Sequence, residues 1–261
     1  MADIAEPLIE RGAYGKTIRL MALLNKGVRD RNGDLIGKTH DVFCIRDGPA
    51  LGGEPAYRIE HLIAGRGAFG DRLGYDRHDM TGPAPLAALF NRLKRGAVGF
   101  RWSDIAEVDA ERITLHRTIA ELDPVHELAG ADHTGRGIGD GAYIGLRILD
   151  SQILDRSGYM CGNVDDLELT LRRGRQPPYV SAILAGPGAL AHRIGGALGR
   201  WIESVHTRLH PEQGGPARID FADVERVTHQ VELSARCEDL DVHRLEAWVS
   251  EHLISRIPGA R

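Results

Sequence analysis

The chain has 261 residues, 42% of them hydrophobic and 27% charged, which is the composition of an ordinary globular protein. Its formal net charge is −4, so no overall positive field favours nucleic acid, and no apolar run reaches the ~18 residues that a membrane span needs. The cysteines Cys44, Cys161 and Cys237 are odd in number and form no CxxC pair, which predicts neither a disulfide framework nor a zinc site.

The start of the chain is predicted to be a lead-in over residues 1–20. A short helix is expected over residues 3–11, and one helical turn over residues 21–26. The start is acidic and lacks an apolar core of signal-peptide length. With the isolated cysteines, this favours a cytoplasmic protein.

The most informative feature of the sequence is an internal duplication. Residues 23–41 return as 148–166 at an offset of 125, which places Gly33 over Gly158. Later blocks match as well: Ile59 to Ala68 lies over Val180 to Ala189, and Trp102 to Val108 lies over Phe221 to Val227. The duplication predicts one fold in two copies, over residues 21–117 and 146–236, with a glycine-rich linker over 118–145 and a C-terminal segment over 237–261.

Each repeat is predicted to consist of short β-strands. Strands are expected near residues 27–31, 37–46, 57–64, 100–102 and 112–116 of the first repeat, and near 152–156, 162–171, 178–185, 217–221 and 229–235 of the second. Asn32-Gly33 is a strong hairpin signal, because both residues tolerate positive φ. Four glycines are therefore interpreted as structural turn residues: Gly33, Gly37, Gly158 and Gly162.

Two amphipathic helices complete the prediction. A helical insert before the last strands of each repeat is expected, and a closing helix follows the second repeat. Five short strands with an Asn-Gly or Ser-Gly first hairpin are characteristic of a small barrel. Because the interior of such a barrel is filled by its own strands, at least one of these apolar stripes is expected to form a homodimer or partner interface. The candidate interface residues are Leu86, Leu89, Phe90 and Leu93 of the insert, and Leu245, Trp248, Val249 and Leu253 of the closing helix.

The first hairpins, V-R-D-R-N-G-D-L-I-G-K-T-H-D-V and I-L-D-R-S-G-Y-M-C-G-N-V-D-D-L, resemble the PRC-barrel family, named for the H subunit of the photosynthetic reaction centre. I-E-H-L-I-A-G and V-S-A-I-L-A-G are similar to its third strand, and W-S-D-I-A-E-V and F-A-D-V-E-R-V to its ending. The resemblance implies a mainly β protein (α+β) with two tandem small barrels. It also implies an interaction module, and it carries no catalytic residue onto this sequence.

Glycine-rich stretches offer a different function. Gly65, Gly67 and Gly70 form a GxGxxG after a predicted strand, which in a dinucleotide site lets the backbone approach a pyrophosphate. The strands before it are joined by hairpins rather than βα crossovers, so a glycine hinge is the competing interpretation. Residues 135–141 could hold phosphate as a backbone nest, or form a flexible linker.

Several histidines and aspartates fit a metal-binding or catalytic role as well as a structural one. His206 and His210 are spaced i, i+4, which can place two imidazoles on one helix face, but a solvated face is the competing interpretation. His126, Asp132 and His133 lie close in sequence. Carboxylates that could form catalytic pairs lie beside the hairpins, where turn hydrogen bonds are the competing role: Asp30, Asp41, Asp155 and Asp166.

The sequence therefore favours a non-enzymatic adaptor or assembly module that binds proteins and needs no cofactor. One alternative is an RNA- or ribosome-associated factor, since local basic clusters can bind phosphates. These clusters comprise Arg92, Lys94, Arg95 and Arg101, and Arg172, Arg173 and Arg175. A second alternative is a nucleotide-binding enzyme that uses Gly65–Gly70.

Overall fold

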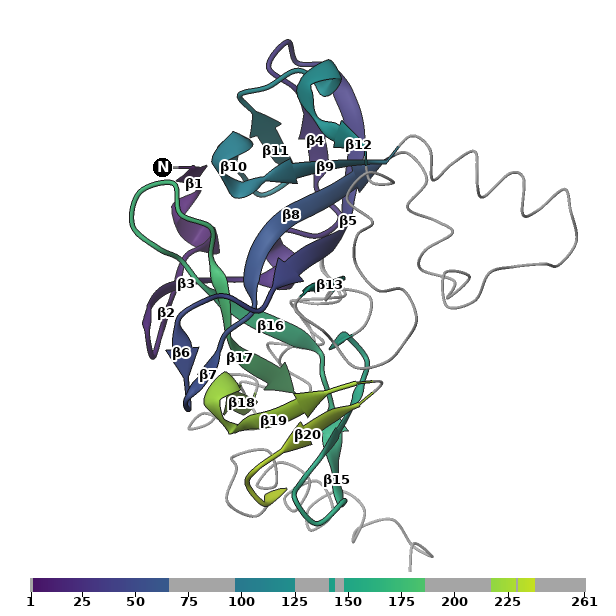
Figure 1. The fold of residues 1–261 in the computed structure, drawn as a ribbon. Coiled ribbons are helices and arrows are strands. Elements are labelled where there is room, and N and C mark those ends of the chain that lie inside the picture. The colour runs from purple at the N-terminus through teal and green to yellow at the C-terminus, as the bar shows by residue number, and fades with distance from the viewer. Residues whose placement is uncertain are drawn as a thin grey trace, which may run out of the picture. The chain divides into compact units, whose positions relative to one another are not determined.

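The computed structural model describes residues 2–65, 97–124, 141–143, 148–185, 217–228 and 230–237. Within these ranges the chain is mainly β-strand, and its helical elements are short 3-10 turns (Figure 1). None of the helices in the described ranges has the length and hydrophobicity needed to cross a bilayer. The chain divides into two compact units: unit 1 comprises Met1–Ala50, Pro55–Arg147 and Glu168–Val180, and unit 2 comprises Leu51–Glu54, Ile148–Leu167 and Ser181–Arg261.

Unit 1 contains the strands of the first repeat. These are β4 (Gly27–Arg29), β5 (Leu35–Ile45), β8 (Arg58–Gly65), β9 (Val98–Arg101), β10 (Ile105–Val108) and β11 (Arg112–Leu115). They pair in the order β10-β11-β4-β5-β8-β9, and only the β11–β4 pair is parallel. The sheet is held by a continuous apolar core, in which Phe100, Ile59, Leu62 and Ile113 have no exposed surface.

Shorter elements extend unit 1. The 3-10 turns are η1 (Glu6–Leu8), η2 (Leu20–Ala22), η3 (Trp102–Asp104) and η4 (Ile119–Glu121). The additional strands are β1 (Asp3–Ile4), β2 (Glu10–Gly12), β3 (Gly15–Arg19), β12 (Asp123–Pro124) and β13 (Gly141–Tyr143). β1 pairs with β10, β2 with β3, β12 with β9 and β13 with β5. A separate hairpin joins β6 (Ala50–Leu51) to β7 (Glu54–Pro55), and its inner residues, Leu51–Glu54, belong to unit 2.

Unit 2 contains most of the second repeat. Its strands are β14 (Gln152–Leu154), β15 (Met160–Asn163), β18 (Ala217–Asp220), β19 (Val224–Val227) and β20 (Val231–Leu233), with the turn η6 (Phe221–Asp223). The sheet order is β15-β14-β20-β19. β16 (Asp166–Thr170) and β17 (Tyr179–Ala185) divide between the units: β17 pairs with β18 in unit 2, while Glu168 to Thr170 pair with β3 in unit 1.

The two repeats have the same strand register, which agrees with the duplication in the sequence. Val28 pairs with Gly37 and with Ile113, and at the corresponding positions Ile153 pairs with Gly162 and with Val231. The bulge before the last residue of β4 recurs in β14. The match extends to the last antiparallel pair, β10–β11 in unit 1 and β19–β20 in unit 2, which share a register shift at the same place.

Two expectations from the sequence are corrected by the described residues. The short helix over residues 3–11 is wrong: the segment forms β1, the turn η1 around Pro7, and β2, because β10 and β3 offer edges with which an extended backbone can pair. No closed barrel forms within the described ranges. In unit 1 the free edges of β9 and β10 are occupied by β12 and β1, so the sheet stays open.

The expected helices lie outside the described residues. The insert with Leu86, Leu89, Phe90 and Leu93 and the closing helix with Leu245, Trp248, Val249 and Leu253 fall in residues 66–96 and 238–261. The corresponding insert of the second repeat falls in residues 186–216. The strands expected around these segments are present as β8, β9, β17 and β18.

Candidate functional site: the anchored hairpins

The first hairpin of each repeat is fixed by one buried carboxylate. We call residues 27–38 and 152–163 the anchored hairpins. In the first, Asp30 Oδ1 accepts hydrogen bonds from the backbone N–H groups of Asn32 (2.8 Å) and Asp34 (3.0 Å). Asp30 Oδ2 lies 3.3 Å from the N–H of Ile119, which donates to it from η4. One side chain thus closes the turn and ties it to a segment 89 residues further along the chain.

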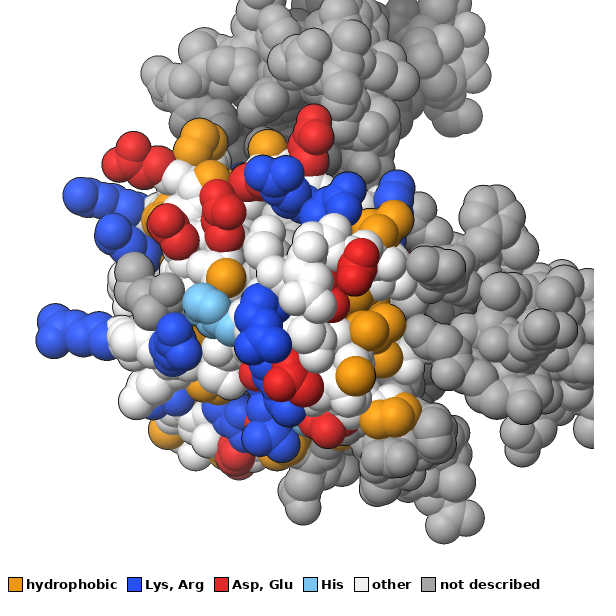
Figure 2. Space-filling model, turned by 90° about the horizontal axis from the view of Figure 1, so that it is seen from above, with side chains coloured by type: hydrophobic (Ala, Val, Ile, Leu, Met, Phe, Trp, Pro, Cys, Tyr) orange, Lys and Arg blue, Asp and Glu red, His pale blue; other side chains and the backbone are white. Residues whose placement is uncertain are grey.

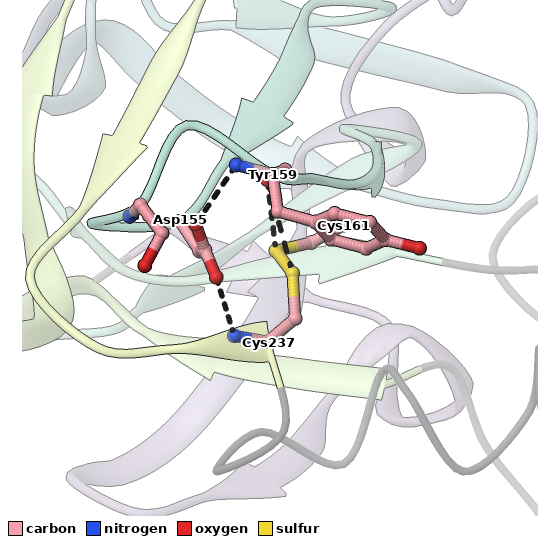
Figure 3. Close-up of a disulfide and its surroundings, with 5 residues drawn as sticks. Asp155, Tyr159, Cys161 and Cys237 are labelled. Atoms are coloured by element: carbon pink, nitrogen blue, oxygen red, sulfur yellow. Dashed lines mark hydrogen bonds between the residues drawn. A yellow bond between two sulfur atoms is a disulfide. The ribbon is translucent and has the colours of Figure 1, made fainter.

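The second anchored hairpin repeats this arrangement with Asp155 (Figure 3). Asp155 Oδ1 accepts from the N–H groups of Ser157 (2.7 Å) and Tyr159 (2.9 Å), and Oδ2 from the N–H of Cys237 (3.3 Å). The Tyr159 N–H, followed by those of Ser157 and Cys237, holds the pKa of Asp155 below its ordinary value. Asp155 therefore remains an anionic acceptor for backbone N–H groups.

A disulfide joins Cys161 of β15 to Cys237, and it was not expected from the sequence (Figure 3). Both sulfur atoms lie near the carbonyl oxygen of Tyr159, at 3.7 and 3.9 Å. The prediction that the cysteines form no disulfide is wrong for this pair, while Cys44 is free and buried. Disulfides persist mainly in oxidising compartments, so this bond does not support the reducing cytoplasm that the sequence suggested.

The disulfide distinguishes the second anchored hairpin from the first. By the shared register, Cys161 corresponds to Ile36 and Cys237 to Ile119, so the first repeat has two isoleucines where the second has a disulfide. Ile36 is buried, whereas Ile119 is 47% exposed. The signal that could have revealed the disulfide is this register, which places Cys237 beside the second anchored hairpin. Sequence spacing alone does not show it.

The other two candidate catalytic carboxylates are buried in strands, Asp41 within β5 and Asp166 at the start of β16. Asp41 Oδ1 accepts from the N–H of Val42 (2.7 Å), and Asp166 Oδ1 from the N–H of Leu167 (2.8 Å). Asp41 and Asp166 are 3% and 0% exposed, which leaves them little access to a substrate. The predicted turn and backbone role fits all four aspartates, because each accepts at least one main-chain hydrogen bond.

The turn glycines behave as expected. Gly33 and Gly158 have φ of 86° and 79°, a region that side chains disfavour. Gly37 and Gly162 also have positive φ, at 159° and 124°. At Gly37 a Cβ would lie 2.3 Å from the carbonyl carbon of Gly65, so β5 and β8 approach too closely there for any side chain.

Gly65 is the only described member of the candidate nucleotide motif. It ends β8 and pairs with Lys38 of β5, so its place in the sheet accounts for the lack of a side chain. Gly67 and Gly70 lie outside the described residues. The histidines His206, His210, His126 and His133 also lie outside them. Among the described residues, no group of three or more His, Cys, Asp or Glu side chains could hold a metal ion.

His61 of β8 is a buried group that sequence reasoning missed. It is 4% exposed, its Nδ1 has no hydrogen-bond partner among the described residues, and its ring centroid lies 6.5 Å from that of Phe43. Its Nε2 lies 3.5 Å from Nε of Arg101 and 4.0 Å from Asp123 Oδ2. Burial lowers the pKa of His61, which favours the neutral imidazole. The second repeat has Ala182 at the corresponding position.

Charged side chains do not gather into one large patch on the face shown in Figure 2. Basic and acidic side chains alternate there, with hydrophobic ones between them. Of the basic clusters, Arg101 and Arg172, Arg173 and Arg175 are described, while Arg92, Lys94 and Arg95 are not. Arg175 Nη2 lies 3.3 Å from His116 Nε2.

Exposed large hydrophobic side chains gather at the anchored hairpins. The described residues include five: Tyr14, Leu35, Ile119, Tyr159 and Met160. Leu35 and Met160 occupy the same position in the two repeats and are 51% and 46% exposed. Tyr159 is adjacent to Met160, and Ile119 donates its N–H to Asp30. Three of the five therefore belong to an anchored hairpin, and a fourth, Ile119, is hydrogen-bonded to one.

Comparison with known proteins assigns no class to this arrangement. No protein-family model matches the chain, and no curated protein matches it. The resemblance to PRC barrels consequently remains a hypothesis that rests on the motifs in the sequence.

Proposed function

We propose that this chain is a non-enzymatic adaptor or assembly module that binds other proteins through two PRC-barrel-like repeats. The observation that carries the proposal is the pair Leu35 and Met160, two large apolar side chains exposed at the same place in each repeat. Exposed large apolar side chains are one feature of protein-binding surfaces. Because each hairpin is fixed by a carboxylate, its exposed residues are presented in a defined conformation.

The described polar groups support a binding role over a catalytic one. The four candidate aspartates already accept backbone hydrogen bonds, and Gly65 is explained by strand packing. The interface expected on the two helices remains part of the proposal, with a homodimer or a different protein as the partner.

A comparison of captured proteins tests this function. The intact chain, the double variant Leu35→Asp/Met160→Asp, and the control Tyr14→Asp are immobilised and exposed to extract of the cells that produce the protein. Tyr14 is a matched control because it is 43% exposed but lies outside the anchored hairpins. We expect proteins that are retained by the intact chain and the control and lost with the double variant, at an unchanged Tm. The same proteins on all three would contradict the proposal.

A further inference from the structure

The outer edge of β10 in unit 1 is covered by a strand from the chain's own start. β1 runs parallel to β10, with Asp3 opposite Glu107 and Ile4 opposite Val108 (Figure 1). The N–H of Ala5 continues the ladder by donating to the Val108 carbonyl at 2.9 Å. The Val108 carbonyl therefore points away from β11, because it bonds to the segment on the other side.

β19 is the strand of unit 2 that corresponds to β10. Val227 pairs with Val231 as Val108 pairs with Ile113. The backbone N–H and C=O of Val227 therefore point away from β20, as those of Val108 point away from β11. In the part of the chain that the structure describes, β19 is the last strand of its sheet and has no partner on that side. Glu225 and Arg226 are exposed along it, and Arg226 is paired with Glu232 of β20. Proteins usually protect such edges, as unit 1 does with β1.

We propose that the outer edge of β19 binds an extended segment of a partner protein as an added parallel strand, and that the segment has an acidic residue followed by an aliphatic one. This inference rests on the proposed function, since it names one surface by which the adaptor would bind a protein. Adding a strand to a sheet edge is a recurrent way to recognise peptides, in which main-chain hydrogen bonds provide the affinity.

The charge on β19 selects the acidic residue. In unit 1, Asp3 lies opposite Glu107, a like-charge pair that is unfavourable across neighbouring strands. Arg226 replaces Glu107 on β19, so a segment bound in the same register places its acid opposite the Arg226–Glu232 ion pair instead of opposite a lone carboxylate. A segment with a sequence like that of β1 therefore matches the charges on β19 better than those on β10. β10 nevertheless pairs with β1, despite the like charges of Asp3 and Glu107.

A labelled peptide tests the site. The probe is a fluorescent peptide with the sequence of residues 2–8 (Ala-Asp-Ile-Ala-Glu-Pro-Leu), titrated into the full chain by fluorescence anisotropy. We expect saturable binding that Arg226→Glu weakens about tenfold. A peptide with Lys in place of its Asp should recover affinity for Arg226→Glu. The control Arg156→Glu changes another exposed arginine of unit 2 and should leave binding unchanged.

Amide hydrogen exchange locates the bound peptide. The N–H of Val227 should exchange fast in the free chain and slow down when the peptide is added, while protection of Val108 stays constant. Absence of peptide binding, or a Val227 amide already protected in the free chain, would overturn the proposal. A concentration-dependent dimer that Arg226→Glu abolishes would also overturn it, since the occupant would then be a second copy.

The two proposals fail in distinguishable ways. If the peptide does not bind but Leu35→Asp/Met160→Asp still loses captured proteins, only the β19 site is wrong. If no captured protein depends on the anchored hairpins, the adaptor function loses its support even where the peptide binds.

Discussion

Asn25 and Asp150 adopt the same left-handed backbone conformation, each with a φ of 66°. Each donates its N–H to the segment that returns from the adjoining hairpin, Asn25 to the Thr39 carbonyl in β5 and Asp150 to the Val164 carbonyl just after β15, both at 2.8 Å. Asn and Asp are the side chains that best tolerate this region. The duplicated fold thus keeps a backbone conformation that only a few residue types accept, and both copies use one of them.

The glycine turn of the first anchored hairpin gives a test of backbone conformation alone. Gly33→Val should lower the free energy of unfolding by about 1–3 kcal/mol, because its φ of 86° disfavours a β-branched side chain. Apart from its two chain neighbours, no described residue has an atom within 4 Å of a Cβ at this position, so the Cβ itself meets no steric overlap. Gly33→Asn is the matched control, and chemical denaturation measures both. Equal stability of Gly33→Val and the native chain would show that the turn has another conformation.

Asp30, the carboxylate that anchors the first hairpin, should contribute more to stability than the exposed Asp34 of the same turn. Asp30→Ala removes the acceptor of three backbone N–H groups and should destabilise the chain by about 1–3 kcal/mol. Asp34→Ala, at an exposed position of the same turn, should change stability little. Denaturation midpoints compare the two variants. If they shift equally, the buried hydrogen bonds of Asp30 contribute nothing specific.

The disulfide should stabilise the second repeat. Cys161→Ser/Cys237→Ser should lower stability by about 2–4 kcal/mol, because the bond restricts the unfolded chain across 76 residues. A reductant should lower the Tm of the native chain and leave that of the double variant unchanged. Mass analysis without reduction should find Cys161 joined to Cys237 and Cys44 free. A native chain with three free thiols would refute the bond.

His61 should make stability depend on pH. Because burial lowers its pKa below the ordinary value of 6.5, the folded chain resists protonation while the unfolded chain accepts it. This contribution is complete above the unfolded pKa of about 6.5, and it is lost in the window that runs from this value down through the lower pKa of the folded state. His61→Gln should flatten the slope of unfolding free energy against pH in that window, and exposed His116→Gln should not. Identical slopes for the native chain and both variants would remove His61 as the cause.

The repeat architecture could be predicted because its signals are local. Asn32-Gly33 fixes a hairpin by its own backbone preferences, and Gly33 and Gly158 have the expected positive φ. Comparing the chain with itself was sufficient to align strands that pair in the same register.

The remaining features depend on partners far away in the sequence. β1 is extended because the edge of β10 lies beside it, and residues 3–11 alone suggest a helix. Cys237 lies beside Cys161 because β20 pairs with β14, so the spacing of the two cysteines in the sequence carries no signal. His61 is buried because β5 and β9 pair with β8 on either side of it. The second repeat has Ala182 at this position, so the duplication gave no sign of a buried histidine.

The bond between Cys161 and Cys237 also changes what a protease can accomplish. It makes the polypeptide between these residues a covalent ring with two tails, so one cut anywhere inside the ring leaves both pieces joined. On a gel without reductant the nicked chain would run as a single band near its full mass, and the fragments would separate only after reduction. Cleavage between residues 162 and 236 can therefore open the backbone without releasing either end.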